Sequence, residues 1–212
     1  MKFYGYCRSS SAYRCRIAFN LKGVRPETEV VNLREGAQKS AEFRALNPQG
    51  LVPALDTGDG VLTQSLAIIE WLDETHPDPA LLPAEPLARA HVRAFAQIIA
   101  CEVHPLQNLR VLNYIKQNYG QDQAGADAWC QHWIAEGLAA CEAIAAAQEH
   151  GGGYTFGDKP GLADICLIPQ MFSADRFGLD LTPYPRLREI RTNCEQLPAF
   201  ADAHPARQSD AT

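Results

Sequence analysis

A polar break, Arg-Ser-Ser-Ser at residues 8–11, separates two apolar segments near the start of the chain. Residues 2–6 alternate and are rich in aromatic side chains, which predicts a short strand. Apolar residues then recur at helical spacing over 13–21, so the break marks a helix start, where N–H groups and partial positive charge stabilise phosphates, carboxylates and thiolates. Arg8 adds a full charge and the three serines add donors. The junction is a candidate anion site, with simple capping by one of its first two serines as the alternative.

Two further junctions in the same region could bind a peptide-like ligand. Pro53 lies inside the expected strand segment 50–55, where it cannot donate to a ladder. Only a few per cent of X-Pro bonds are cis, so a trans bond is expected, whereas a cis bond would turn the backbone of Val52 outward to pair with an extended peptide. Gln64 and Ser65 open another apolar-periodic helix, whose first N–H groups suit a carboxylate, again with simple capping as the alternative.

The elements around these junctions follow the order β-α-β-α-β-β-α within residues 1–80. The second strand is expected at 29–33 and the second helix at 38–46, and two short strands at 50–55 and 61–63 flank a Gly-Asp-Gly turn. This order predicts a small mixed sheet with helices on its faces. All three junctions could then open on one cleft at the strand ends.

The second half of the chain changes character after residues 77–86, whose four prolines we interpret as a linker. Beyond them the sequence is rich in alanine and periodic at helical spacing, and the glycines at 151–153 interrupt the pattern. Helices are expected over 88–118, 124–149, 162–176, 185–195 and 197–204. The predicted fold class is therefore an α/β domain over residues 1–80 followed by an all-α domain over 87–212.

Composition and charge argue against several classes of function. Hydrophobic residues make up 46% and charged residues 21% of the chain, and the formal net charge of −6 disfavours nucleic-acid and membrane partners. No secretory signal and no apolar stretch of spanning length is visible. The seven cysteines lack Cys-x-x-Cys pairs and zinc spacing, which indicates reduced thiols in a cytoplasmic protein and no metal site.

Several segments taken together resemble the glutathione transferase superfamily and, more narrowly, its zeta class. The segments are YCRSSSAYRCRIA at 6–18, NPQGLVP at 47–53, QSLAIIE at 64–70, HPLQNLRVL at 104–112, DRF at 175–177 and LTPYP at 181–185. They are spread over essentially the whole chain. The resemblance implies a thioredoxin-like first domain, an all-helical second domain, a homodimer, and glutathione bound along the first domain.

The resemblance also implies roles for residues at the three junctions. Ser9 would face the glutathione sulfur, and Val52 would pair its backbone with the cysteinyl unit. Gln64 and Ser65 would hold the γ-glutamyl carboxylate. Further cofactor contacts are implied at Ser10, Ser11, Gln38, Gln49, His104, Asn108 and Arg110. His104 as a core or interface histidine and Tyr6 as the thiol-activating group remain alternatives.

The zeta class includes isomerases of maleylpyruvate and maleylacetoacetate, which implies a glutathione-dependent cis–trans isomerase acting on a small dicarboxylate. The thiolate adds to the cis double bond, the adduct rotates about a single bond, and elimination releases the trans product. Lowering a thiol pKa from about 8.5 by ~2 units is worth about 2.7 kcal/mol, which a helix N-terminus and a serine hydroxyl can largely supply. Conversion of maleylpyruvate in aromatic-acid breakdown is the leading interpretation. A maleylacetoacetate isomerase, a conjugating transferase and a non-catalytic partner protein are the alternatives.

A dianionic substrate needs cations where its charge develops, and arginine binds carboxylates through a bidentate fork. Arg8 is placed by the motif, and Arg176 ends the predicted helix 162–176, where the family's substrate pocket lies. A surface arginine favoured by the helix C-terminus is the alternative for Arg176, and Arg110 is a third candidate for this charge. Two positions depart from the class: Ser11 replaces a cysteine, and Gly161 replaces a capping serine or threonine at a cost of about a few tenths of a kcal/mol.

Overall fold

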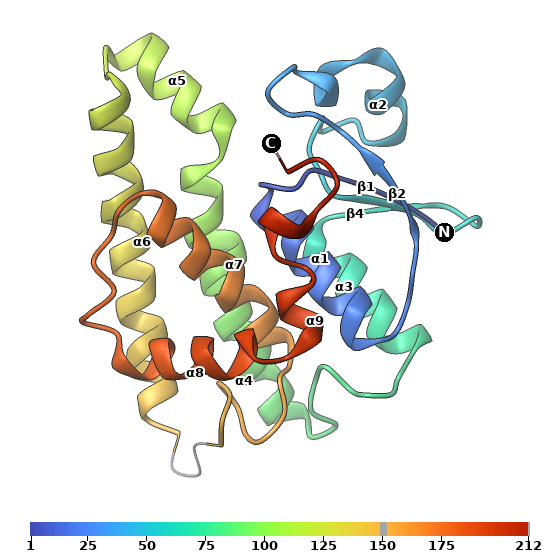
Figure 1. The fold of residues 1–212 in the computed structure, drawn as a ribbon, viewed down its shortest axis with the longest axis vertical. Coiled ribbons are helices and arrows are strands. Elements are labelled where there is room, and N and C mark those ends of the chain that lie inside the picture. The colour runs from blue at the N-terminus through green and yellow to red at the C-terminus, as the bar shows by residue number, and fades with distance from the viewer. Residues whose placement is uncertain (149–151, 212) are drawn as a thin grey trace. The chain divides into compact units, whose positions relative to one another are not determined.

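A computed structural model describes residues 1–148 and 152–211, and its contacts divide the chain into two compact units (Figure 1). The first unit comprises Met1–Leu81 together with Glu195–Thr212, and the second comprises Leu82–Cys194. The domain boundaries expected from sequence stay a prediction, and the C-terminal segment groups with the sheet-containing unit.

The first unit is built on a four-stranded sheet in the order β2-β1-β3-β4. Its elements are β1 Lys2–Gly5, α1 Ser10–Leu21, β2 Glu27–Val30, the 3-10 turn η1 Ala37–Lys39, α2 Ala41–Leu46, β3 Ala54–Asp56, β4 Val61–Thr63 and α3 Ser65–Thr75. Strand β1 pairs in parallel with β2 and antiparallel with β3, which pairs antiparallel with β4. Helices α1 and α3 lie side by side on one face of the sheet (Figure 1). The predicted order and the thioredoxin-like fold class are confirmed.

The burial of β1 explains why α1 packs where it does. Phe3 is almost fully buried opposite Leu55 of β3 and meets Phe19 of α1 edge to face, with ring centroids 5.1 Å apart. The edge strand β2 is exposed along its length, and Glu29 pairs with Lys2 of β1 at 3.0 Å. Charge on an exposed edge protects a sheet from pairing with other chains. The apolar alternation of β1 therefore determines which face of the sheet receives α1.

The C-terminal segment of the first unit is less helical than the sequence predicts. The expected helix at 197–204 is wrong in length: α9 spans Pro198–Ala201, and a separate 3-10 turn, η4, spans Pro205–Arg207. His204 adopts φ −55° and ψ 138°, the extended conformation that a following proline imposes, so the helix cannot continue through it. Asn20 of α1 donates to the carbonyl of Ala199 at 2.9 Å and ties this segment to α1.

The second unit is helical as expected, but its first long helix is interrupted. The helix expected over 88–118 is wrong: the structure has α4 Pro86–Gln97, a π-helical segment Ile98–Val103, a 3-10 turn His104–Gln107 and α5 Leu109–Tyr119. Pro105 removes a helical N–H inside this window, and Asn108 starts α5 afresh by accepting from the N–H of Arg110 at 3.1 Å. Apolar periodicity continues across the break, so the pattern alone conceals it.

The remaining helices of the second unit follow the predictions more closely. They are α6 Gln123–Ala146, α7 Leu162–Arg176 and α8 Pro185–Glu195. The predictions for α7 and α8 are confirmed, whereas α6 ends before residue 149. The predicted glycine break begins at residue 151, and both 149 and 151 lie outside the described residues.

A buried carboxylate compensates for the unusual glycine at the start of α7. Asp164 accepts hydrogen bonds from the N–H of Gly161 at 2.8 Å, from the N–H of Thr155 at 2.9 Å and from the Thr155 hydroxyl at 2.7 Å. Burial raises the pKa of Asp164, while these three donors act in the opposite direction. Asp164 thus joins the N–H of Gly161 at the start of α7 to Thr155 of the preceding loop.

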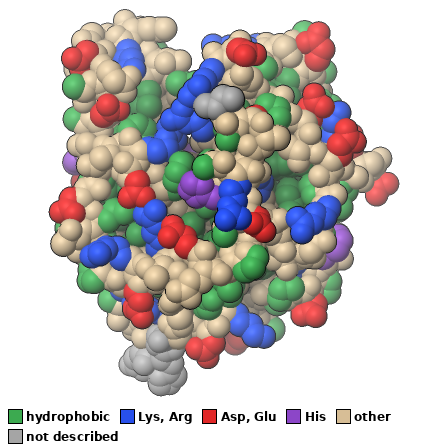
Figure 2. All heavy atoms as spheres, in the orientation of Figure 1, with side chains coloured by type: hydrophobic (Ala, Val, Ile, Leu, Met, Phe, Trp, Pro, Cys, Tyr) green, Lys and Arg blue, Asp and Glu red, His purple; other side chains and the backbone are tan. Residues whose placement is uncertain are grey.

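The surface carries charge of both signs. On the face drawn in Figure 2, acidic and basic side chains are interspersed among apolar and neutral ones. Within 1–148 and 152–211, no helix is long and apolar enough to cross a membrane. All seven cysteines lie in the described part and are present as thiols, six of them buried and Cys101 exposed.

Candidate functional site

Ser9 caps α1 with its hydroxyl oxygen, while its hydroxyl hydrogen is directed toward the Oγ of Ser11. Its backbone is extended at φ −76° and ψ 116°, and its Oγ accepts from the N–H of Ala12 at 3.2 Å. A hydroxyl that accepts a hydrogen bond is polarised and becomes a better donor through its own hydrogen. Ser9 is therefore the N-cap of α1. The anion site stays a prediction, which this cap favours because it places the Ser9 hydroxyl at the positive end of the helix.

Ser11 joins the start of α1 to the loop before β3. Its Oγ donates to the carbonyl of Val52 at 3.3 Å and lies 3.3 Å from the Oγ of Ser9. Ser10 is buried, whereas Arg8 is exposed. The first two predicted junctions thus meet through one hydroxyl, at the position where the zeta class usually carries a cysteine. A thiol is a weaker donor than a hydroxyl, so the departure strengthens this link.

The loop over residues 47–53 contains a correction to the sequence prediction. The Val52–Pro53 bond is cis, so the expected trans bond is wrong. General X-Pro statistics carry no information about the tertiary surroundings that select one isomer. Asn47 stabilises the loop by donating from Nδ2 to the carbonyl of Leu51 at 2.7 Å and accepting from the N–H of Gln49 at 3.1 Å.

The start of α3 forms the third junction. Gln64 occupies the cap position with φ 69°, in the left-handed region that non-glycine residues rarely adopt, and makes no side-chain cap bond. Its Nε2 donates instead to Oε1 of Gln49 at 2.7 Å, which links α3 to the loop 47–53. The capping alternative for the Gln64 side chain is wrong. Such backbone strain is typical of ligand-binding positions.

Arg14 is a buried charged residue beside the third junction, and no sequence prediction included it. It is 1% exposed, and its Nη1 donates to the buried hydroxyl of Ser65 at 3.3 Å. A fully buried arginine places positive charge beneath the start of α3, where the helix already favours anions. The available signal was a charged residue on the buried face of α1, two positions before the second arginine of the same motif, Arg16.

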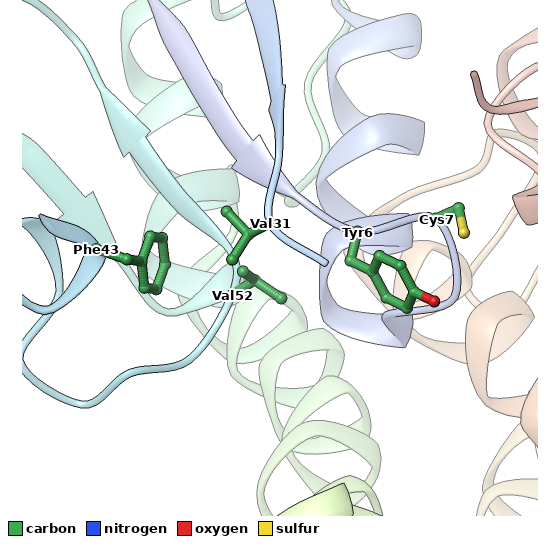
Figure 3. Close-up of a cluster of buried hydrophobic side chains, with 5 residues drawn as sticks. All are labelled: Tyr6, Cys7, Val31, Phe43 and Val52. Carbon is green, nitrogen blue, oxygen red and sulfur yellow. The ribbon is translucent and has the colours of Figure 1, made fainter. Parts of the chain in front are cut away.

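An apolar cluster lies behind these junctions. Figure 3 shows Val31, Phe43 and Val52 lying close together, with Tyr6 and Cys7 on the loop between β1 and α1. These buried side chains exclude water from one side of the loop over residues 47–53. Electrostatic interactions of polar groups beside them are stronger than they would be in water.

Gln38 packs against Gly50 of the loop over residues 47–53, and its side-chain oxygen, Oε1, is a buried acceptor without a donor among the described residues. A Cβ built on Gly50 would stand 2.9 Å from the Gln38 carbonyl oxygen, which shows how tightly the two backbones pack. Buried amide oxygens are almost always hydrogen-bonded, so the acceptor suits an N–H donor from a ligand.

The other predicted site residues belong to the second unit. His104 begins the 3-10 turn before α5, Asn108 caps α5, and Arg110 is exposed in its first turn. Arg176 is the exposed last residue of α7, with its guanidinium carbon 5.6 Å from the centroid of the Phe177 ring. The first unit contains the others, which are Arg8, Ser9, Ser10, Ser11, Gln38, Gln49, Val52, Gln64 and Ser65. Hydrogen-bond contacts join Ser9 to Ser11, Ser11 to Val52 and Gln64 to Gln49.

Comparison with known proteins identifies the family. Models described as the glutathione S-transferase N-terminal and C-terminal domains match residues 8–75 and 126–192. A curated maleylpyruvate isomerase from a Ralstonia species is 51% identical over 211 residues, which span 100% of both chains. The chain belongs to the glutathione transferase family. A maleylacetoacetate isomerase from Pseudomonas aeruginosa is 47% identical, covering 99% of this chain and 98% of that protein.

Solved structures place this transferase in the zeta class. The holo structure of a bacterial maleylpyruvate isomerase of that class has a TM-score of 0.99 at 50% identity and covers 100% of both chains. A maleylacetoacetate isomerase from Methylobacterium extorquens, solved with malonate and glutathione, has a TM-score of 0.97 at 41% identity, again over 100% of both chains. The enzyme from Anaeromyxobacter dehalogenans, solved with dicarboxyethyl glutathione and citrate, has a TM-score of 0.87 at 42% identity and covers 100% of this chain and 97% of its own.

The packing of Gly50 against Gln38 gives a stability prediction for this transferase. Gly50→Ala should lower the free energy of unfolding by more than the ~1–2 kcal/mol that a left-handed alanine costs, because its Cβ also collides with the Gln38 carbonyl. Gly23→Ala is the matched control, since Gly23 has φ +66° and open space around its Cβ position. Urea unfolding of both variants measures the difference. Equal losses would contradict the close approach at Gly50.

Proposed function

We propose that this glutathione transferase is a glutathione-dependent cis–trans isomerase that converts maleylpyruvate to fumarylpyruvate in aromatic-acid breakdown. The observation that carries the proposal is the Ser9 hydroxyl, which is oriented by the N–H of Ala12 at the positive end of α1 and can stabilise a thiolate there. The similarity to curated isomerases along the whole chain supports the same reaction. Maleylacetoacetate is the second candidate substrate, favoured by the 47% identical relative.

The first unit fits a γ-glutamyl tripeptide. The strained start of α3 offers helix N–H groups over the buried charge of Arg14, which suits the γ-glutamyl carboxylate at Gln64 and Ser65. The buried Oε1 of Gln38 accepts from a peptide N–H or an ammonium group. When bound, glutathione supplies the thiol nucleophile whose addition and elimination interconvert the cis and trans double bonds.

Each residue at the three junctions then has a defined task. Ser9 donates to the sulfur and favours its ionised form, and the backbone of Val52 binds the cysteinyl unit. Gln49 is oriented by the Nε2 of Gln64 toward the same ligand. The remaining proposed cofactor contacts are Ser10, Ser11, His104, Asn108 and Arg110.

We assign the binding of the negatively charged substrate to two arginines. Arg8 adjoins Ser9 and is exposed, and Arg176 is exposed at the end of α7. Planar guanidinium groups bind carboxylates through paired hydrogen bonds, and the substrate becomes more negative as the thiolate adds. We also propose that the transferase is a cytoplasmic homodimer, since the cysteine usage fits a reducing compartment and the class resemblance implies pairing.

Assays with the two maleyl substrates test the reaction directly. We expect loss of maleylpyruvate, followed by absorbance, to require glutathione and to leave the total glutathione thiol unchanged, because the cofactor is regenerated. Maleylacetoacetate assayed in parallel decides between the candidate substrates through kcat/KM. Consumption of glutathione in proportion to product would reject isomerisation in favour of conjugation.

Removal of the Ser9 hydroxyl should raise the pKa of the bound thiol. In Ser9→Ala we expect a rise of about one unit, equivalent to about 1.4 kcal/mol of lost thiolate stabilisation, measured by titrating the ultraviolet thiolate absorbance. Ser40→Ala is the matched control, because the Ser40 Oγ caps α2 by accepting from the N–H of Phe43 at 3.1 Å. An unshifted titration in Ser9→Ala would remove Ser9 from the mechanism.

Loss of either substrate arginine should reduce turnover and spare cofactor binding. Arg8→Ala and Arg176→Ala should each lower kcat/KM for maleylpyruvate about 10- to 100-fold, as expected for a lost charge-assisted pair. The Kd for glutathione, measured by calorimetry, should change little. Arg25→Ala and Arg188→Ala remove exposed arginines elsewhere and serve as controls. Wild-type kinetics in both test variants would reject the two-arginine assignment.

A further inference from the structure

The short loop between β1 and α1 is held in place by residues that the reaction itself does not use. Residues 6–9 form this loop, which carries both Arg8 and Ser9. Within the loop, the Ser9 N–H donates to the carbonyl of Tyr6 at 3.1 Å. The Ser9 carbonyl accepts from the N–H of Tyr13 in α1 at 2.8 Å. The backbone groups of Tyr6 and Cys7 are bound by Arg16 and by the C-terminal segment, so those two elements orient the first half of the loop.

Arg16 of α1 donates hydrogen bonds to the backbone of this loop. Its Nη2 donates to the carbonyl of Cys7 at 2.9 Å and its Nη1 to the carbonyl of Tyr6 at 3.3 Å. Its Nε donates to the carbonyl of Ala203 at 3.0 Å, so one guanidinium joins the loop to the C-terminal segment. The guanidinium also lies over the ring of Tyr13, 5.3 Å from its centroid. Burial lowers the pKa of Arg16 to about 10, which leaves the group charged at neutral pH.

Asp210 binds the same loop from the opposite end of the chain. Its Oδ2 accepts from the N–H of Cys7 at 2.8 Å, and its backbone carbonyl accepts from the Cys7 Sγ at 3.3 Å. Cys7 is 3% exposed, and both burial and Asp210 raise the pKa of its thiol, so the sulfur remains a neutral donor. In Figure 1 the red C-terminal segment lies alongside the blue β1–α1 connection.

These bonds occupy both backbone polar groups of Cys7, whose N–H binds Asp210 and whose carbonyl binds Arg16. The next two residues along the chain are Arg8 and Ser9, so a rotation of this peptide would displace the guanidinium and the hydroxyl together. We propose that Asp210 and Arg16 are positioning residues, which clamp the β1–α1 loop so that Ser9 and Arg8 are held in their working orientation. The proposal rests on the roles proposed above for Ser9 and Arg8.

Asp210→Ala tests the clamp in the full-length protein. We expect kcat for maleylpyruvate to fall about tenfold, since small misplacements of reacting groups have effects of this order. The pKa of the bound glutathione thiol should rise, while the thermal unfolding midpoint changes by less than about 3 °C. Asp210→Asn keeps an acceptor oxygen and should restore part of the loss. Asp202→Ala is the matched control, because Asp202 is a carboxylate of the same segment that pairs with Arg207 at 2.7 Å.

A labelling experiment gives a readout that is independent of turnover. Cys7 should react with iodoacetamide at least about tenfold faster in Asp210→Ala than in wild type. The reason is that loss of the Asp210 carboxylate lets the C-terminal segment move away from the Cys7 sulfur. Peptide mass spectrometry identifies the labelled cysteine, and deletion of residues 210–212 should give the same result.

Three outcomes would overturn the clamp. The first is that kcat, the thiol pKa and Cys7 labelling are all unchanged in both Asp210→Ala and the deletion. The second is that Asp202→Ala lowers kcat as much as Asp210→Ala does. The third is that the loss of kcat only follows the fraction of unfolded protein. Failure of the proposed function is distinguishable. If the wild type turns over neither maleyl substrate, the reaction assignment is wrong, while thiol titration and Cys7 labelling still decide whether the clamp exists.

Discussion

The first N–H groups of a helix have no intrahelical partners, and at α1 this constraint falls on Ser9, the residue to which we assign thiolate stabilisation. The Ser9 hydroxyl satisfies one of these groups by accepting from Ala12, and its own hydrogen is directed toward the Oγ of Ser11. Capping and the proposed anion binding are therefore two uses of one geometry. The other polar contacts described for the first unit link the segments that carry the proposed glutathione-binding residues.

The supporting features are short polar links between segments that are distant in sequence. Ser11 reaches the carbonyl of Val52, Gln64 reaches Gln49, and Arg14 reaches Ser65. Individually such bonds contribute about 0.5–1.5 kcal/mol, and those to charged groups somewhat more. Their larger effect is on geometry, since several groups must be held within a fraction of an ångström for a thiolate to be stabilised.

Polar links between separate segments of the chain also occur in the second unit. Asp164 satisfies the start of α7 and the loop before it. The Gln107 Nε2 donates to Oε1 of Gln170 at 2.7 Å, which joins the 3-10 turn before α5 to the buried face of α7. A buried polar pair of this kind is strongly oriented, because few other partners are available in the core. The π-helical segment at 98–103 lies directly before this turn and keeps Ile99 and Val103 buried.

Local chemistry in the sequence was sufficient to predict the order of strands and helices, the start of α1 within residues 8–11, the bounds of α7 and α8, and the family. These features depend on neighbours within a few residues, such as caps, apolar spacing and turn glycines. Only the tertiary structure decided the cis bond at Pro53, the left-handed Gln64, the burial of Arg14, the break in the helix expected over 88–118, and the return of Asp210 to Cys7. The last of these joins residues 203 positions apart, and no local pattern contains such a distance. The helix start that contains Ser9 could be located from its own neighbourhood, whereas the contacts around it come from segments that meet only when the chain is folded.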